Sequence, residues 1–297
     1  MRTYSSRQVL FISVAVAVLT VGAVAAFRMS PLYHSARRLV AGFGVLHGDL
    51  THVSRRGPRL TSAEVTAMRK TYSDIVKARS EKVDQASIDQ IMRAYREDRI
   101  QRSLHWFGIP TEKNPTDAWM MQQLIAEIRP DYIVETGTWR GGSALFFATI
   151  LEGCGLYDSR IATIDIENSV LDATGEHPFY ERHVEAIIGS SIDPTVVAKV
   201  TERVKGKRVM VFLDSLHNKE HVLAELKAYA PLVSPGSYII VEDTHLDSII
   251  WPDGAPGPFA AVEAFLGSTP RPPFQRDLSR EVFMVTNNPG GYLRRDS

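Results

Sequence analysis

Two apolar runs between residues 209 and 245 each end in acidic side chains. The run "VFLD" ends at Asp214 and is followed three residues later by His217, and the run "YIIVED" ends at Glu242 and Asp243. Carboxylate oxygens are preferred ligands of hard cations such as Mg²⁺, and an imidazole beside such a cation can take a proton from a hydroxyl group. These residue types predict a Mg²⁺ site at Asp214, Glu242 and Asp243, with His217 as the general base.

Simpler roles for these residues are also consistent with the sequence. Acids at the end of a strand often cap a helix or stabilise a turn, and a histidine at the start of a helix can make only a local hydrogen bond. Three neighbouring carboxylates without a cation would repel one another, which favours the metal site. His221 and His245 are weaker candidates for the base.

A glycine-rich loop, "VETGTWRGGS" at residues 134–143, offers a second ligand site. Its glycines permit a tight turn and a close approach of a ligand to the amino terminus of the next helix. The loop lacks the G-x-G-x-x-G spacing of a dinucleotide site, and its acid would repel a pyrophosphate but pair with an ammonium group. S-adenosylmethionine carries such an ammonium group, so we expect this donor to contact Glu135, Gly137, Thr138, Gly141 and Ser143.

Polar residues after the next two apolar runs extend this predicted donor site. Asp165 follows one run and is placed to accept hydrogen bonds from ribose hydroxyl groups, while Ser190 and Ser191 follow the next run and could line an adenine edge. Each of these alone would be an ordinary loop residue. Because they occur in order after successive runs, together with the glycine-rich loop, we expect them to bind S-adenosylmethionine.

The elements that must position these residues alternate between helices and short apolar strands from about residue 117 onward. Five segments are expected as strands: "YIVET", "RIATIDI", "VEAIIG", "VMVFLD" and "SYIIVED". Their uniform apolar character is typical of parallel strands covered on both faces by helices. The sequence therefore predicts a Rossmann-like, doubly wound α/β fold with a mostly parallel sheet, which binds ligands at the carboxyl ends of its strands. Neighbouring strands lie about 4.8 Å apart, so acids from two strand ends can reach one cation.

Two long blocks carry a resemblance to a known family: "HWFGIPTEKNPTDAWMMQQLIAEIRPDYIVETGTWRGGSALFFA" and "VFLDSLHNKEHVLAELKAYAPLVSPGSYIIVEDTH". From about residue 93 to residue 285, the chain resembles the cephalosporin hydroxylase/rhamnosyl O-methyltransferase family of S-adenosylmethionine-dependent enzymes. The resemblance implies a class I methyltransferase fold and the same three metal-ligating acids. The Asp-x-x-His spacing from Asp214 to His217 is similar to that of macrolide-sugar O-methyltransferases, in which the histidine is a proposed base.

The amino-terminal segment differs in composition from the rest of the chain. Residues 9–27 are uncharged and would form a helix roughly 28 Å long, close to the thickness of membrane hydrocarbon. We expect a single-pass signal anchor with the catalytic domain in the cytosol, where S-adenosylmethionine is made. The alternatives are a cleaved signal peptide with export, and a buried core helix.

The expected organisation is a tail (1–8), the anchor (9–27), a linker (28–60), a helical lead-in (61–112), the methyltransferase domain (113–290) and a second tail (291–297).

Composition limits the remaining functional classes. The 34 basic residues balance 34 acidic residues, so net charge gives no argument for a nucleic-acid partner, and the single cysteine excludes a disulfide framework or a multi-cysteine zinc site. We therefore expect an Mg²⁺-assisted, S-adenosylmethionine-dependent O-methyltransferase. Its acceptor would be a hydroxyl group of a sugar, a glycoside or another small polar natural product. The alternatives are a hydroxylase, suggested by the family name alone, and a non-catalytic scaffold that binds the cofactor; a homo-oligomer is also left open.

Overall fold

The structure, a computed structural model, describes residues 59–80 and 82–296. The predicted membrane anchor at residues 9–27, and all but the last two residues of the predicted linker, lie outside the described residues. Within the described part of the chain, no helix combines the length and the hydropathy that a membrane span requires.

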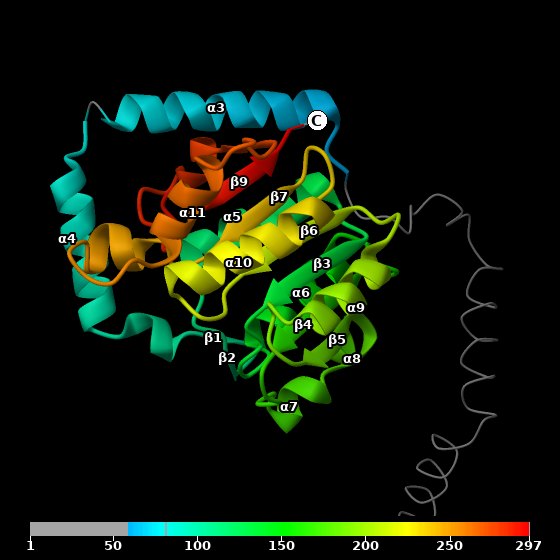
Figure 1. Ribbon diagram of the computed structural model, residues 1–297. Helices are drawn as coiled ribbons and strands as arrows, with labels where there is room; N and C mark the ends of the chain where they lie inside the picture. The colour runs from blue at the N-terminus through cyan, green and yellow to red at the C-terminus, as the bar shows by residue number, and fades with distance from the viewer. Residues whose placement is uncertain (1–58, 81, 297) are drawn as a thin grey trace, which may run out of the picture. The chain divides into compact units, whose positions relative to one another are not determined.

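Seven strands form one sheet in the order β5-β4-β3-β6-β7-β9-β8 (Figure 1). The five strands from β5 to β7 are parallel to one another, whereas β9 is antiparallel to both of its neighbours. The predicted mostly parallel α/β sheet is therefore confirmed, and the two strands that precede the predicted acids are neighbours. The strands are β3 (Tyr132–Thr136), β4 (Arg160–Asp165), β5 (Val184–Ile188), β6 (Val209–Leu213), β7 (Tyr238–Val241), β8 (Phe274–Arg276) and β9 (Tyr292–Arg295).

Helices cover both faces of this sheet. On one face, Phe147 of α6 packs in the same apolar cluster as Phe212 of β6, and on the other face Leu226 of α10 shares a cluster with Val211. Val211 and Phe212 are consecutive, so alternate side chains of one buried strand contribute to two separate layers. The helices are α5 (Pro115–Ile128), α6 (Gly142–Gly153), α7 (Asp172–Gly175), α8 (Pro178–His183), α9 (Pro194–Val204), α10 (Lys219–Tyr229), η2 (Ala230–Leu232) and α11 (Pro258–Leu266).

The described part of the lead-in begins with the helices α3 and α4, which have amino-terminal caps. The sequence "TSAE" at residues 61–64 predicts a capping box at the start of α3 (Ser62–Ser80). It is present, because Thr61 N donates to Glu64 Oε2 at 2.7 Å and Glu64 N donates to Thr61 Oγ1 at 3.2 Å. The sequence "SIDQ" predicts that the second helix begins at residue 87. It begins earlier, as α4 (Gln85–Glu97), because the side chain of Asp84 accepts a hydrogen bond from Ala86 N.

Between α3 and α5, the chain packs against the loop that follows β7. Ile88 and Met92 of α4 pack with Ile249 of the π-helical turn η3 (Leu246–Ile250). This contact brings α4 next to the loop that follows β7 (Figure 1). A 3₁₀ turn and a short hairpin complete the path: η1 (Ile100–Ser103), β1 (His105–Trp106) and β2 (Ile109–Pro110).

The carboxyl-terminal segment forms part of the sheet. The sequence predicts a tail at residues 291–297, but β9 lies between β7 and β8. Four residues are too short a run to indicate which strand they pair with. A buried ion pair fixes the preceding turn η4 (Leu278–Glu281): Arg280 donates to both carboxylate oxygens of Glu127 at 2.8 Å, and both side chains are fully buried.

Candidate active site

A cavity of about 890 Å³ opens at the carboxyl ends of β3, β4, β6 and β7. This volume is in the range of small-molecule sites, and the position is where doubly wound sheets bind ligands. Two of the predicted site residues, Glu135 and Gly141, do not line the cavity. Those that line it are Gly137, Thr138, Ser143, Asp165, Ser190, Ser191, Asp214, His217, Glu242 and Asp243.

The glycine-rich loop is shaped by close contacts that exclude side chains. Gly137 has φ +90°, and a Cβ atom at this position would lie 1.9 Å from the backbone oxygen of Asp214. Gly141 has φ +79° and is the N-cap of α6. Asp165 Oδ2 accepts hydrogen bonds from Thr138 N and Trp139 N, both at 2.9 Å. Asp165 thus holds the loop in place, and its Oδ1, which accepts one hydrogen bond from Ile166 N at 2.7 Å, keeps capacity for a further one.

Glu135 lies behind the loop and is fully buried. Its Oε2 accepts a hydrogen bond from Thr163 Oγ1 at 2.7 Å, but its Oε1 has no partner among the described residues. Burial raises the pKa of Glu135 to about 7, although the Lys113 ammonium group counters this effect. A buried carboxylate oxygen without a donor is costly, so this side chain is suited to a cationic ligand group.

The loop after β5 lines one end of the cavity, and a second polar cluster lies there. Ser191 Oγ lies 3.0 Å from His221 Nε2, and the same nitrogen lies 3.5 Å from Glu225 Oε1. Glu225 is fully buried and also accepts a hydrogen bond from Ser215 Oγ at 2.7 Å. Within the described residues, no hydrogen bond or ion pair links His221 to Asp214 or Asp243. His221 is therefore poorly placed to act as a base at the acidic end of the cavity.

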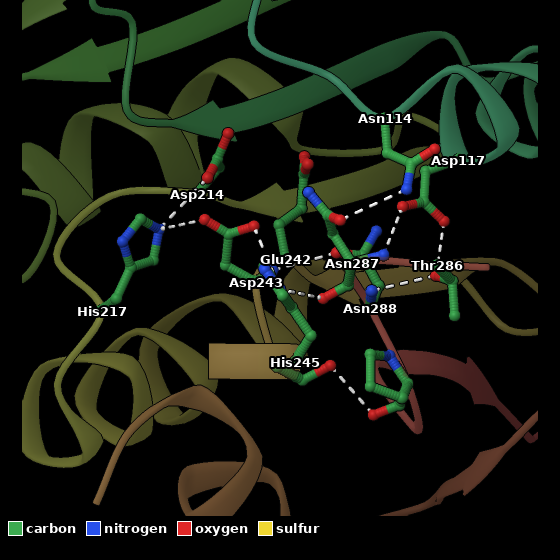
Figure 2. Close-up of polar contacts among 12 residues, drawn as sticks. Asn114, Asp117, Asp214, His217, Glu242, Asp243, His245, Thr286, Asn287 and Asn288 are labelled. Carbon is green, nitrogen blue, oxygen red and sulfur yellow. Dashed lines mark hydrogen bonds and ion pairs between the residues drawn. The ribbon is translucent and has the colours of Figure 1, made fainter. Parts of the chain in front are cut away.

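The acidic end brings Asp214, His217 and Asp243 together (Figure 2). His217 Nε2 lies 3.3 Å from Asp214 Oδ1 and 3.5 Å from Asp243 Oδ2. One potential ligand atom from each of the three residues lies within 4.8 Å of the others. Asp243 has a left-handed backbone with φ 58°, and its N–H donates to Asn288 Oδ1 at 2.9 Å. That turn directs the Asp243 carboxylate toward His217.

Lys113 is a site residue that the sequence does not reveal. Its Nζ lies 2.5 Å from Asp214 Oδ2 and 2.6 Å from Glu242 Oε2, and its side chain is 5% exposed. The structure therefore places Glu242 against a lysine, apart from the cluster of Asp214, His217 and Asp243. A single lysine before a helix N-cap has no diagnostic spacing, and its partners lie 101 and 129 residues away in the chain.

The electrostatics of the acidic end follow from these contacts. Burial opposes ionisation of Asp214, but Lys113 and His217 outweigh it and lower the pKa of Asp214 to about 2. Burial raises the pKa of Glu242, an effect that the Lys113 ammonium only partly offsets. Burial disfavours the imidazolium form of His217, yet Asp214 and Asp243 together raise its pKa to about 9. Without a metal ion, His217 is therefore protonated at neutral pH.

Asp117, at the amino end of α5, is a second residue that the sequence does not reveal. Its Oδ1 accepts a hydrogen bond from Thr286 Oγ1 at 2.5 Å, and its Oδ2 accepts one from Asn287 N at 2.7 Å (Figure 2). The Tyr292 hydroxyl also donates to Oδ1, at 2.8 Å. These bonds hold the carboxyl-terminal segment against the site. They also position Asn287, whose carbonyl oxygen accepts a hydrogen bond from His245 Nδ1 at 3.0 Å.

The remaining wall of the cavity comes from the lead-in. Arg96, Gln101 and Arg102 line the cavity, and Gln101 is 5% exposed with a buried Oε1 that has no partner among the described residues. Trp251 follows β7 and does not line the cavity. Arg96 lies over its ring, 5.6 Å from the centroid. Polar side chains of the lead-in therefore face the space next to the acidic end.

Comparison with known proteins assigns the chain to a family. The model of the rhamnosyl O-methyltransferase/CmcI family matches residues 98–296. The chain belongs to this family. The lead-in before residue 98, with α3 and α4, lies outside the matched range.

Similar proteins agree with this assignment. A rhamnosyl O-methyltransferase of Mycobacterium bovis is 34% identical over 196 residues, which cover 64% of this chain and 78% of the relative. That of Mycobacterium leprae is 32% identical over 195 residues, covering 64% and 82%. A solved structure of CmcI in an Mg-SAM form is 20% identical with a TM-score of 0.51, covers 66% of this chain and 78% of CmcI, and supports the fold. The predicted family and the predicted O-methyltransferase activity are confirmed.

Proposed function

We propose that this family member transfers a methyl group from S-adenosylmethionine to a hydroxyl group of a sugar, a glycoside or another small polar molecule. The observation that carries the proposal is the convergence of Asp214 Oδ1 and Asp243 Oδ2 on His217 Nε2 at one end of a cavity. The glycine-rich loop and Asp165 border the same cavity. The mycobacterial relatives are named for a rhamnosyl acceptor, which supports a sugar hydroxyl here.

The acidic end fits a hard divalent cation such as Mg²⁺. Asp214 and Asp243 each offer a carboxylate oxygen, and Mg²⁺ is commonly bound by one or two carboxylates together with water and substrate oxygens. When bound, the cation would lower the pKa of a nearby acceptor hydroxyl group. It would also favour the neutral form of His217, because a second positive charge beside the imidazole disfavours its protonation.

The residues of the chain would then act in order. His217 Nε2 would take the proton of the acceptor hydroxyl, and the oxygen lone pair would form a bond to the methyl carbon. The carbon–sulfur bond would break, with its electron pair remaining on sulfur to give S-adenosylhomocysteine. Asp214 and Asp243 would stabilise the imidazolium, because both carboxylates face Nε2.

The opposite end of the cavity suits the donor. Asp165 lines the cavity, and its Oδ1 has free acceptor capacity for ribose hydroxyl groups. Glu135 is buried behind the loop and would favour the ammonium group through its charge rather than by direct contact. Ser190 and Ser191 border the space proposed for the adenine edge. Gln101 and the two arginines of the lead-in would contact the acceptor, because they line the cavity outside the glycine-rich loop.

The direct test is methyl transfer from radiolabelled S-adenosylmethionine to a panel of glycosides. We expect label in the product, a loss of at least about 100-fold when the divalent cation is removed with EDTA, and recovery when Mg²⁺ is added. S-adenosylhomocysteine should form in equal amount. Transfer that is unaffected by EDTA would contradict the metal-assisted mechanism, and oxidation of the glycoside instead of methylation would support the hydroxylase alternative.

The donor set itself does not favour the hydroxylase. Non-haem iron oxygenases use two histidines and one carboxylate, whereas the described cluster consists of one histidine and two carboxylates. The nearest further histidine, His245, uses its Nδ1 to donate to a backbone carbonyl. Carboxylate-rich sites are typical of Mg²⁺.

We also propose that residues 9–27 anchor the enzyme in a membrane, with the catalytic domain on the cytosolic side. The length and apolar character of this segment support the anchor, and the cytosolic supply of S-adenosylmethionine supports the orientation. In intact cells we expect a carboxyl-terminal tag on the full chain to be protected from added protease. Cleavage of that tag in intact cells, or release of the protein after removal of the segment by a signal peptidase, would support export instead.

A further inference from the structure

Two arginines of the lead-in line the cavity with their charges unpaired. Arg96 lies in the last turn of α4 and Arg102 lies in η1. In the part of the chain that the structure describes, neither guanidinium group forms an ion pair or a hydrogen bond. Glu112 also lines the cavity, but it is exposed and pairs with neither arginine. Two unpaired guanidinium groups on one cavity wall are suited to an anionic group of a ligand.

The position of Arg96 is fixed by its surroundings. Its guanidinium carbon lies over the ring of Trp251, 5.6 Å from the centroid, and such a cation–π contact orients the side chain without neutralising its charge. The helix α4 is fixed to the turn η3, because Arg93 Nη1 donates to the carbonyl oxygen of Ile250 at 3.2 Å. The positive charge of Arg96 is therefore held on the side of the cavity that adjoins the loop after β7.

Gln101 adds a second, independent feature to this wall. It lines the cavity and is buried, and its Oε1 has no hydrogen-bond partner among the described residues. A buried amide oxygen without a donor is costly, so a ligand hydroxyl group that donates to it would be favoured. The wall thus combines an acceptor for a hydroxyl group with two cations for an anion. A sugar that carries an acidic substituent offers both groups.

We propose that the acceptor is an anionic sugar with a carboxylate or a phosphate group, which Arg96 and Arg102 bind while Gln101 accepts a hydrogen bond from a sugar hydroxyl group. This inference rests on the proposed function and narrows its class of acceptor. The three residues determine specificity and take no part in proton transfer. Arg96 lies before residue 98, where the family match begins, so the family assignment does not account for it.

The test is a competition between matched acceptors in one reaction with radiolabelled S-adenosylmethionine. Each neutral glycoside of the panel is paired with its uronide, which carries a carboxylate, and with its phosphate ester. We expect kcat/KM of at least one anionic acceptor to exceed that of its neutral partner by at least about 30-fold, because charge-assisted hydrogen bonds are the stronger ones. The two anionic arms show which acid group the wall prefers. Equal kcat/KM values within every matched set would overturn the proposal.

Variants of the two arginines test whether they cause this preference. Arg96→Gln and Arg102→Gln should each reduce the preference by at least about ten-fold, while kcat/KM for the neutral glycoside stays within about three-fold. The ratio of two products in one mixture does not depend on the folded fraction of the enzyme. Because Arg102 is exposed, Arg102→Gln remains informative if Arg96→Gln does not fold. A preference that persists in Arg102→Gln and in any folded Arg96→Gln would contradict the proposal.

Arg99→Gln is the matched control. Arg99 is exposed in the same lead-in and does not line the cavity, so its replacement removes an equal charge and should leave the preference unchanged. An equal loss of preference in Arg99→Gln would show a general effect of charge and overturn the assignment to Arg96 and Arg102. The Kd of S-adenosylmethionine is measured in parallel. A weakening of more than about ten-fold in the Arg96 or Arg102 variant would show that the arginine binds the donor carboxylate, which also overturns the proposal.

The same panel separates this inference from the proposed function. If neutral glycosides are methylated as well as their anionic partners, the role of the arginines is wrong while the methyltransferase activity stands. If no acceptor is methylated and no S-adenosylhomocysteine forms, both proposals fail.

Discussion

Replacing Asp214 with asparagine should lower kcat for methyl transfer by about three orders of magnitude, while the Kd of S-adenosylmethionine changes by less than about three-fold. The variant retains the shape of the side chain but removes the charge that contacts Lys113 and His217. Electrostatic and metal contributions of several kcal/mol would be lost, and each 1.36 kcal/mol corresponds to about ten-fold in rate. Single-turnover transfer and equilibrium binding of the donor measure the two quantities separately.

Asp193→Asn is a suitable control for that experiment. Asp193 is exposed, does not line the cavity, and caps α9 by accepting a hydrogen bond from Thr195 N at 2.7 Å. Asparagine caps helices about as well as aspartate, so activity should be unchanged. If Asp214→Asn kept more than about a tenth of the wild-type rate, the proposed role of this carboxylate would be wrong. A parallel loss of donor binding would instead show that Asp214 mainly supports the glycine-rich loop.

Replacing His217 with glutamine should lower kcat by about 1,000-fold while leaving the Kd of Mg²⁺ within about three-fold. A general base contributes typically about 10²- to 10⁴-fold to the rate, and glutamine cannot accept the acceptor's proton at neutral pH. The imidazole faces both carboxylates and is 33% exposed, so a base and a metal ligand are both sterically feasible roles. The division of the effect between kcat and metal affinity distinguishes the two.

His221→Gln provides the matched histidine control. His221 contacts Ser191 and Glu225 at the donor end, so its replacement should affect donor binding more than the pH-dependent chemical step. A loss of Mg²⁺ binding in His217→Gln as large as that in Asp243→Asn would identify His217 as a ligand. In that case the base must be sought elsewhere in the cavity.

The sheet and the position of the site were predictable because the relevant signals are local. Strands β3 to β7 are short apolar runs, and each predicted site acid lies at or just beyond the end of one of them. The carboxyl ends of parallel strands meet at one edge, so sequence position alone places Asp165, Asp214 and Asp243 around one cavity. The amino-terminal boundary of the second lead-in helix differs from the expectation, and β9 forms where a tail was expected.

The contacts within the site could not be predicted because they depend on distant parts of the chain. Lys113 and Asp117 have partners more than 100 residues away, and neither occurs in a recognisable spacing. Glu242 and Asp243 are consecutive, and neighbouring residues of an extended chain point in opposite directions. The left-handed turn at Asp243 directs that carboxylate to His217, whereas Glu242 reaches Lys113. The residue types alone do not indicate which of these two acids faces His217 and which faces Lys113.

The hydrogen bonds of Asp117 determine when the acidic end of the cavity can assemble during synthesis of the chain. Its partners at Thr286, Asn287 and Tyr292 leave the ribosome some 170 residues after Asp117 itself. A nascent chain that has already folded β3 to β7 therefore still lacks the segment that supports Asp243 through Asn288. During translation, the unfinished enzyme should be unable to assemble its acidic end, and methyl transfer should begin only after β9 has been synthesised and inserted.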